Sequence, residues 1–228
     1  LNYTRVAMWA QDWNLAVIMP SGENKFYCDN PVSNDNFGTF VGEELVQITR
    51  RMFRLSAKRE DTYVAGLSMG GLGALLTGFR YPDTFSRIGA FSSALILDNP
   101  ALDDKGTTLF RYDSTGEPIS RAQFYESSVG PLDQLPQRND CYELARACVR
   151  QGTAPAVFQS CGTSDFLLQP NRAYKEFLES LGIPLHYEEG DGGHDWFFWD
   201  KSLYHFLSWL PLEPMTPAPN SGHGFLHL

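Results

Sequence analysis

One stretch of the sequence decides the fold: Tyr63-Val64-Ala65-Gly66-Leu67-Ser68-Met69-Gly70-Gly71-Leu72-Gly73-Ala74. It begins with residues typical of a strand and ends with small residues typical of a closely packed helix. Its centre, Gly66-x-Ser68-x-Gly70, fits a tight strand-to-helix turn, because glycines two residues to either side of the serine avoid collisions in a strained backbone. We predict that Ser68 is a nucleophile at a helix N-terminus, where backbone N–H groups meet developing negative charge. A purely structural Gly-Ser-Gly turn is the alternative interpretation.

Composition is that of a single-domain globular protein. The 228 residues fit one α/β domain, with 43% hydrophobic and 20% charged residues. The formal net charge of −9 argues against a nucleic-acid partner, because no stripe of Lys and Arg is present to neutralise phosphates. No run of about 18 apolar residues occurs, so no membrane span is expected.

The cysteines and the first residues bear on the compartment. Cys28, Cys141, Cys148 and Cys161 do not have the spacing of metal ligands, so we expect reduced thiols, no metal and a cytoplasmic protein. The first residues, Leu1–Arg5, contain neither an initiating Met nor a signal-peptide pattern. A secreted form with a leader already removed therefore stays an alternative.

Strand and helix patterns alternate along the chain, which predicts a mostly parallel sheet with helices on both faces. The expected strands are short β-branched and aromatic runs at residues 15–19, 62–65, 87–91, 156–160 and 185–188. The expected helices span residues from 40 to 55, the stretch directly after Ser68, a segment from 170 to 181, and residues from 196 to 209.

The domain organisation follows from the same patterns. We assign residues 1–210 to one α/β domain. Within it, residues 99–138 are rich in Asp, Gly, Pro and Ser, and so long a connection predicts a lid or insertion. Residues 211–228 contain four prolines and predict an extended or disordered tail.

A serine nucleophile needs a neighbouring base, usually a histidine that a carboxylate orients. In a fold with a nucleophile elbow, the expected chain order is serine, acid, histidine, each on a loop at the carboxyl edge of the sheet. The glycine-rich loop between the last expected strand and helix contains His194, which is the candidate base. The other four histidines are not preferred, because they lie within a strand pattern, within a helix pattern or in the tail: His186, His205, His223 and His227.

Asp165 is the candidate acid, because it is the only carboxylate in the turn Cys161–Leu167 after the penultimate strand. Asp191 and Asp195 compete with it, but they lie so close to His194 in sequence that their loop would have to fold back on itself. We interpret both as loop or helix-cap residues. Asp165 is expected to accept the proton of one ring nitrogen, which fixes the tautomer and stabilises the imidazolium.

The backbone N–H of Met69, the residue after the nucleophile, is the expected first donor of an oxyanion hole. The second donor normally follows an earlier strand, and no such strand and turn precede Asn2. The sequence therefore identifies one donor and leaves the second unassigned.

Four segments carry a family resemblance: Leu15–Tyr27, Glu43–Leu45, Ala65–Gly71 and Gly192–Trp196. On these segments, and over residues 1 to 210, the chain resembles the esterase D-type branch of the α/β hydrolases, and it is most similar to tributyrin esterase and feruloyl esterase-like members. The resemblance implies an α/β-hydrolase fold and a Ser–His–Asp triad acting on carboxylic esters. Family members carry further strands ahead of the point that matches residue 1. A sheet without these N-terminal strands is therefore expected, and its exposed edge would favour a homo-oligomer.

The first functional hypothesis is a serine carboxylesterase that hydrolyses short-chain or aryl esters (acetyl, butyryl or feruloyl-type) through an acyl-enzyme. It needs no metal or cofactor, and its partner is a small-molecule ester. Five aromatic residues expected near the site suit an apolar or aryl acyl group, although core positions would explain most of them equally well: Trp9, Trp13, Phe26, Tyr27 and Trp196. Two alternatives stay open. One is an acyltransferase to an alcohol acceptor, and the other is a catalytically impaired homologue that acts as a binding module.

Overall fold

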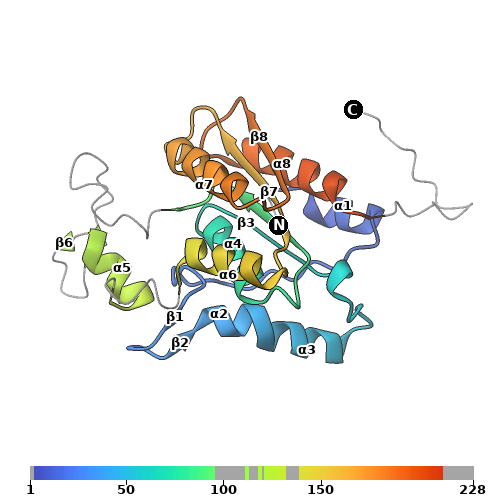
Figure 1. The fold of residues 1–228 in the computed structure, drawn as a ribbon, viewed down its shortest axis with the longest axis horizontal. Helices are drawn as coiled ribbons and strands as arrows, with labels where there is room; N and C mark the ends of the chain where they lie inside the picture. Colours follow the sequence, from blue (N-terminus) through green and yellow to red (C-terminus); the bar gives the residue numbers. More distant parts are fainter. Residues whose placement is uncertain (1–2, 96–110, 113–117, 120, 132–138, 213–228) are drawn as a thin grey trace, which may run out of the picture.

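Four parallel strands form the centre of the molecule (Figure 1). The computed structural model describes residues 3–95, 111–112, 118–119, 121–131 and 139–212. In spatial order the strands are β3 (Tyr63–Leu67), β4 (Arg87–Phe91), β7 (Ala156–Gly162) and β8 (Leu185–Gly190). All three pairings are parallel. This confirms the mostly parallel sheet predicted from the sequence.

Helices cover both faces of this sheet. One face carries α4 (Met69–Arg80), α6 (Cys141–Gln151) and α7 (Leu168–Ser180), and the other carries α1 (Val6–Asp12) and α8 (Trp196–Trp209). Successive side chains of a strand point to opposite faces, so β4 contributes to two separate cores. Ile88 and Ala90 pack with α4, whereas Phe91 packs with α8.

Smaller elements complete the described chain. They are the two-stranded pairs β1 (Asp29–Asn30) with β2 (Asp35–Asn36) and β5 (Arg111–Tyr112) with β6 (Pro118–Ile119), and the helices α2 (Phe37–Thr39), α3 (Leu45–Met52) and α5 (Arg121–Val129). A π-helical segment, Phe40–Glu44, joins α2 to α3, and a 3-10 turn, Arg59–Asp61, precedes β3. The expected helix at residues 40 to 55 is thus a continuous helical run over residues 37–52.

The predicted strand at residues 15–19 is wrong. This segment has no strand pairing in the described chain, and Val17, Ile18 and Met19 are 38%, 41% and 57% exposed. An apolar run becomes a strand only where a neighbouring strand bonds its N–H and C=O groups. Among the described strands, β3 pairs only with β4 and is one edge of the sheet. The side-chain pattern alone therefore predicts a strand here that does not form.

Other predicted elements are either confirmed or lie outside the described residues. The predicted strand 87–91 and helix 196–209 coincide with β4 and α8. Most of the predicted lid at 99–138 and the tail after residue 212 lie outside the described residues.

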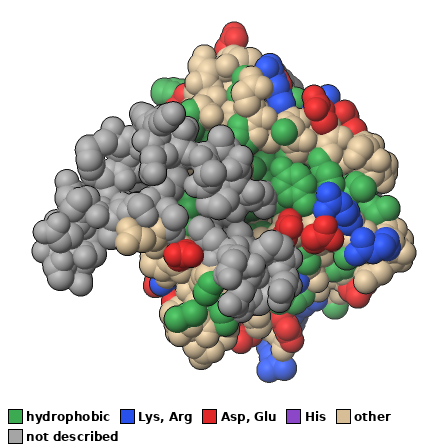
Figure 2. Space-filling model, turned by 60° about the vertical axis from the view of Figure 1, so that its left-hand side comes forward, with side chains coloured by type: hydrophobic (Ala, Val, Ile, Leu, Met, Phe, Trp, Pro, Cys, Tyr) green, Lys and Arg blue, Asp and Glu red, His purple; other side chains and the backbone are tan. Residues whose placement is uncertain are grey.

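None of the described helices is long and apolar enough to cross a membrane. On the face drawn in Figure 2, Lys and Arg side chains lie beside Asp and Glu side chains.

Candidate active site

Ser68 occupies the junction between β3 and α4, in a backbone conformation that side chains rarely adopt. Its φ is +54° and its ψ is −119°. Two backbone hydrogen bonds hold it, one to the last residue of β4 and one to the loop that follows: the Ser68 N–H donates to the Phe91 carbonyl, and the Ala94 N–H donates to the Ser68 carbonyl, each at 2.9 Å. A strained backbone conformation persists only where the surrounding contacts hold it in place. Residues with such backbones are common at functional sites.

The glycines around Ser68 are not equally constrained. A Cβ on Gly66 would lie 2.1 Å from the Gly70 carbonyl oxygen, and a Cβ on Gly71 would lie 3.0 Å from the Phe91 carbonyl oxygen. A Cβ on Gly70 would meet nothing nearer than the Tyr27 ring at 3.9 Å, which is ordinary contact. The expectation that both flanking glycines are required therefore holds sterically for Gly66 and not for Gly70.

Asp165 and His194 meet at the carboxyl edge of the sheet. Asp165 lies in the turn after β7 and its side chain is fully buried, whereas the His194 side chain, after β8, is 21% exposed. His194 Nδ1 lies 2.9 Å from Asp165 Oδ2, and the Leu167 N–H donates to Asp165 Oδ1 at 2.9 Å. The two loops approach closely because Gly162 has no side chain: a Cβ there would lie 2.4 Å from the Gly192 carbonyl oxygen.

The structure brings the three predicted residues into one hydrogen-bonded chain. His194 Nε2 lies 2.8 Å from Ser68 Oγ. A carboxylate accepts but does not donate, so contact with Asp165 places the ring proton on Nδ1 and leaves Nε2 to accept the Ser68 hydroxyl proton. Met69 follows directly as the first residue of α4, where backbone N–H groups have no partner within the helix.

Asp195, an alternative candidate for the acid, caps a helix. It is the N-cap of α8, and its Oδ1 accepts hydrogen bonds from the N–H groups of Phe197 and Phe198 at 3.0 Å. The backbone N–H groups of Phe198, Gly193 and Phe197 hold the pKa of this carboxyl below its usual range. Asp195 therefore caps the helix that follows His194, as the sequence indicated.

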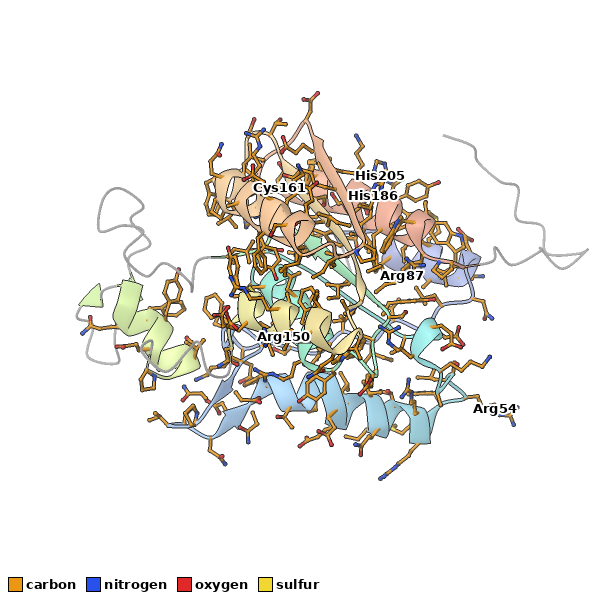
Figure 3. All side chains as sticks on the ribbon, in the orientation of Figure 1. Arg54, Arg87, Arg150, Cys161, His186 and His205 are labelled. Carbon is orange, nitrogen blue, oxygen red and sulfur yellow. The ribbon has the colours of Figure 1, made fainter. Side chains whose placement is uncertain are left out.

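Two further histidines form a separate cluster on β8 and α8 (Figure 3). His186 Nε2 and His205 Nδ1 contact the two oxygens of Glu188 at 2.7 and 2.6 Å. Neither histidine is part of the Ser68 chain of hydrogen bonds. His223 and His227 lie outside the described residues.

The sequence did not predict several of the contacts that His194 makes. Trp199 packs edge-on against the imidazole, with ring centroids 4.8 Å apart, and its Nε1–H donates to the buried Ser92 Oγ at 3.1 Å. Phe166 contacts the same imidazole at 4.7 Å. Ser92 follows a parallel strand at its carboxyl end, a position that could have drawn attention to it. No comparable signal marks the two rings.

Most of the aromatic residues expected near the site belong to the cores instead. Trp9 and Phe26 are buried, one against α8 and the other beside α4 and α5, and Trp13 packs on the edge of the α8 core. Tyr27 packs over Gly73 in α4. Trp196 differs, because it is 41% exposed and contacts Trp199.

A parallel sheet with a strained serine between strand and helix, and with Asp–His–Ser contact at its carboxyl edge, defines a serine hydrolase of the α/β-hydrolase fold. The protein is an enzyme of this class. The family described as "Putative esterase" matches residues 9–210. The chain belongs to that esterase family, which confirms the resemblance stated from the sequence.

Individual relatives agree with this assignment. An acetyl esterase of Caldicellulosiruptor saccharolyticus is 38% identical over 208 residues, 90% of this chain and 75% of that protein. Among solved structures, the substrate-bound fluorophosphonate-binding serine hydrolase F of Staphylococcus aureus has a TM-score of 0.75 at 26% identity, over 92% of this chain and 76% of that one. The S-formylglutathione hydrolase of the same organism has a TM-score of 0.74 at 26% identity, over 91% and 76%.

Proposed function

We propose that this esterase is a serine carboxylesterase that hydrolyses short-chain or aryl esters, of acetyl, butyryl or feruloyl type, through an acyl-enzyme intermediate. Ser68 is the nucleophile, His194 the general base and acid, and Asp165 the residue that orients the imidazole. The observation that carries the proposal is the hydrogen-bonded chain of Asp165, His194 and Ser68, with contacts of 2.9 and 2.8 Å. The name of the Caldicellulosiruptor relative, an acetyl esterase, supports a short acyl group.

In the first step, Ser68 Oγ attacks the ester carbonyl carbon while His194 Nε2 takes the hydroxyl proton. Asp165 stabilises the resulting imidazolium through its contact with Nδ1, and it remains ionised. The carbonyl oxygen becomes an oxyanion, and we expect the Met69 N–H at the start of α4 to donate a hydrogen bond to it. Loss of one such donor costs about 2.7–4 kcal/mol of transition-state stabilisation in comparable sites.

Collapse of this tetrahedral intermediate breaks the bond to the alcohol. His194 Nε2 gives its proton to the leaving alkoxide, which departs as the alcohol, and the acyl group stays on Ser68. In the second step His194 takes a proton from water, the hydroxide adds to the acyl carbon, and the proton returns to Ser68 Oγ as the acid leaves. No net change remains on the enzyme.

The experiment measures turnover of p-nitrophenyl acetate and butyrate, together with labelling of the serine by a fluorophosphonate. We expect Ser68→Ala to lose both, and Asp165→Asn to lower kcat by about 10⁴-fold, because the wrong tautomer of His194 is then favoured. Ser180→Ala is the matched control, because the hydroxyl of this exposed serine donates to the Phe177 carbonyl in its own helix. It should behave as the wild type does.

Equal turnover or equal labelling of wild type and Ser68→Ala would refute the nucleophile assignment. Addition of an acceptor alcohol separates hydrolysis from acyl transfer. If the acetyl group went to that alcohol in preference to water, the enzyme would be an acyltransferase and the hydrolytic proposal would be wrong.

A further inference from the structure

His194 lies within a continuous row of aromatic rings. Tyr3 stacks on Trp196 at 5.0 Å, Trp196 meets Trp199 edge-on at 5.2 Å, and Trp199 meets His194 edge-on at 4.8 Å. Phe166 contacts His194 with its centroid 4.7 Å away. The imidazole that contacts Ser68 is therefore in contact with two aromatic rings.

The row is buried in its middle and exposed at its ends. Trp199 is 6% exposed and forms part of the core beneath α8. Phe166, in contrast, is 70% exposed, although its neighbours Asp165 and Leu167 are 5% and 4% exposed. A single exposed phenylalanine is unremarkable on most of a protein surface. Here, however, the exposed ring contacts the imidazole of the candidate catalytic base, so it lies beside the place where a substrate must react.

The reaction mechanism determines which part of the ester binds beside His194 and Phe166. His194 Nε2 must give its proton to the leaving oxygen, so the alcohol oxygen has to come within about 2.6–3.2 Å of that nitrogen. The carbonyl oxygen points instead towards the N-terminus of α4 and the Met69 N–H. The alcohol portion of the ester, and not its acyl portion, therefore extends along the side of the site that holds His194 and Phe166.

We propose that Phe166 forms a subsite for the alcohol portion of the ester and selects alcohols whose ring presents a flat apolar face. This inference rests on the proposed function. Such a face packs against an aromatic ring, which contributes beyond simple burial. Two kinds of alcohol have this chemistry: an aryl-methanol, through its aromatic ring, and a pyranoside, through the C–H face of its sugar ring.

The test compares acetate esters of three alcohols that are all poor leaving groups: benzyl acetate, a monoacetylated methyl pyranoside and 2-methoxyethyl acetate. The readout is the ratio of kcat/KM for each ring alcohol to kcat/KM for the acyclic one. We expect at least one ratio to exceed one in the wild type, and Phe166→Ala to lower it about 3- to 10-fold. The ring alcohol whose kcat/KM ratio falls more in Phe166→Ala identifies which kind of ring, aromatic or sugar, packs on Phe166.

Conservative variants separate a flat ring from mere bulk. Phe166→Tyr keeps the ring and should keep the ratio, whereas Phe166→Leu keeps apolar volume without the flat face and should lose it. Phe53→Ala is the matched control, because Phe53 is also an exposed phenylalanine, at 55%, and follows α3, well away from α8 in Figure 1. It should leave every ratio unchanged.

Two results would overturn the subsite: wild-type ratios at or below one, or a Phe166→Ala variant that slows all three esters equally. The second result would mean that Phe166 only positions His194. A wild type that hydrolyses the esters with ratios insensitive to Phe166 refutes the subsite alone. A wild type that hydrolyses none of them and leaves Ser68 unlabelled by the fluorophosphonate refutes the proposed function itself.

Discussion

The two glycines of the elbow should respond in opposite ways to the same substitution, Gly→Ala. A Cβ on Gly66 would lie 2.1 Å from the Gly70 carbonyl oxygen and 2.3 Å from the Gly70 carbonyl carbon. Both atoms belong to backbone in the first turn of α4, so no side chain can rotate away to make room. A Cβ on Gly70 would lie 3.9 Å from the nearest side-chain atom, in the Tyr27 ring.

The magnitudes follow from these contacts. Overpacking typically costs 1–3 kcal/mol, and a collision between backbone atoms belongs at the upper end, so we expect Gly66→Ala to lose about 3 kcal/mol of unfolding free energy. For a chain of this size that loss lowers Tm by about 6–12 °C. Gly70→Ala replaces a flexible residue in a helix with the best helix former, and should leave the unfolding free energy unchanged or raise it by up to about 1 kcal/mol.

The assay is a thermal melt of both variants beside the wild type, followed by p-nitrophenyl acetate turnover below the melting range. Gly66→Ala should also lose turnover, because relief of the collision moves Ser68 and the Met69 N–H that follows it. A Gly66→Ala variant as stable as the wild type would refute the steric argument. Equal destabilisation by Gly70→Ala would refute it too, because it would mean that both glycines serve the turn alike.

Two further predictions concern buried thiols and pH. Burial raises the pKa of Cys28 and of Cys161 (labelled in Figure 3) to about 12, so these thiols should react with Ellman's reagent only after unfolding in guanidinium, and stoichiometric reaction of the native protein would contradict this. Burial alone would raise the pKa of Glu188, but the contacts with His186 and His205 outweigh it and the pKa is lowered from 4.5. A group with a lowered folded pKa stabilises above its unfolded pKa and loses that stability as the pH falls through the folded value. The Tm gap between wild type and Glu188→Gln should therefore narrow as the pH falls from 5 to 3, and a gap that stays constant over that range would show that Glu188 contributes no pH-dependent stability.

The sequence predicted elements well where the local pattern determined the structure. Residues 87–91 alternate between the two cores of the sheet, and residues 196–209 place Trp199 and Phe206 on one buried helical face. The segment at residues 15–19 has an equally strand-like pattern, but a strand also needs a bonded neighbour, and its own sequence does not supply one.

The environment of the site was harder to predict than its three central residues. Glycine at position 70 looks as necessary as glycine at position 66, because a sequence motif does not show which Cβ direction is blocked. The sequence around Phe166 contains no motif that assigns it a role. Its exposure and its contact with His194 depend on how the turn after β7 packs against the loop after β8, and neither segment determines that alone.

Backbone bonds beyond the strand ends help to hold the three candidate residues, Ser68, Asp165 and His194, close together. The strand ladder continues into the loops: Ser68 N–H bonds the Phe91 carbonyl, Ser92 N–H bonds the Ser160 carbonyl, and Ser164 N–H bonds the Gly192 carbonyl, at 2.7–2.9 Å. The first two bonds tie the residue after one strand to the neighbouring strand, and the third ties the loop after β7 to the loop after β8, so the register of the sheet helps to set the separation of Ser68, Asp165 and His194. Side chains on a rigid edge of this kind are held in reacting geometry before substrate arrives. Chain order and strand pattern specify that edge, whereas the rings around His194 depend on packing that the pattern does not encode.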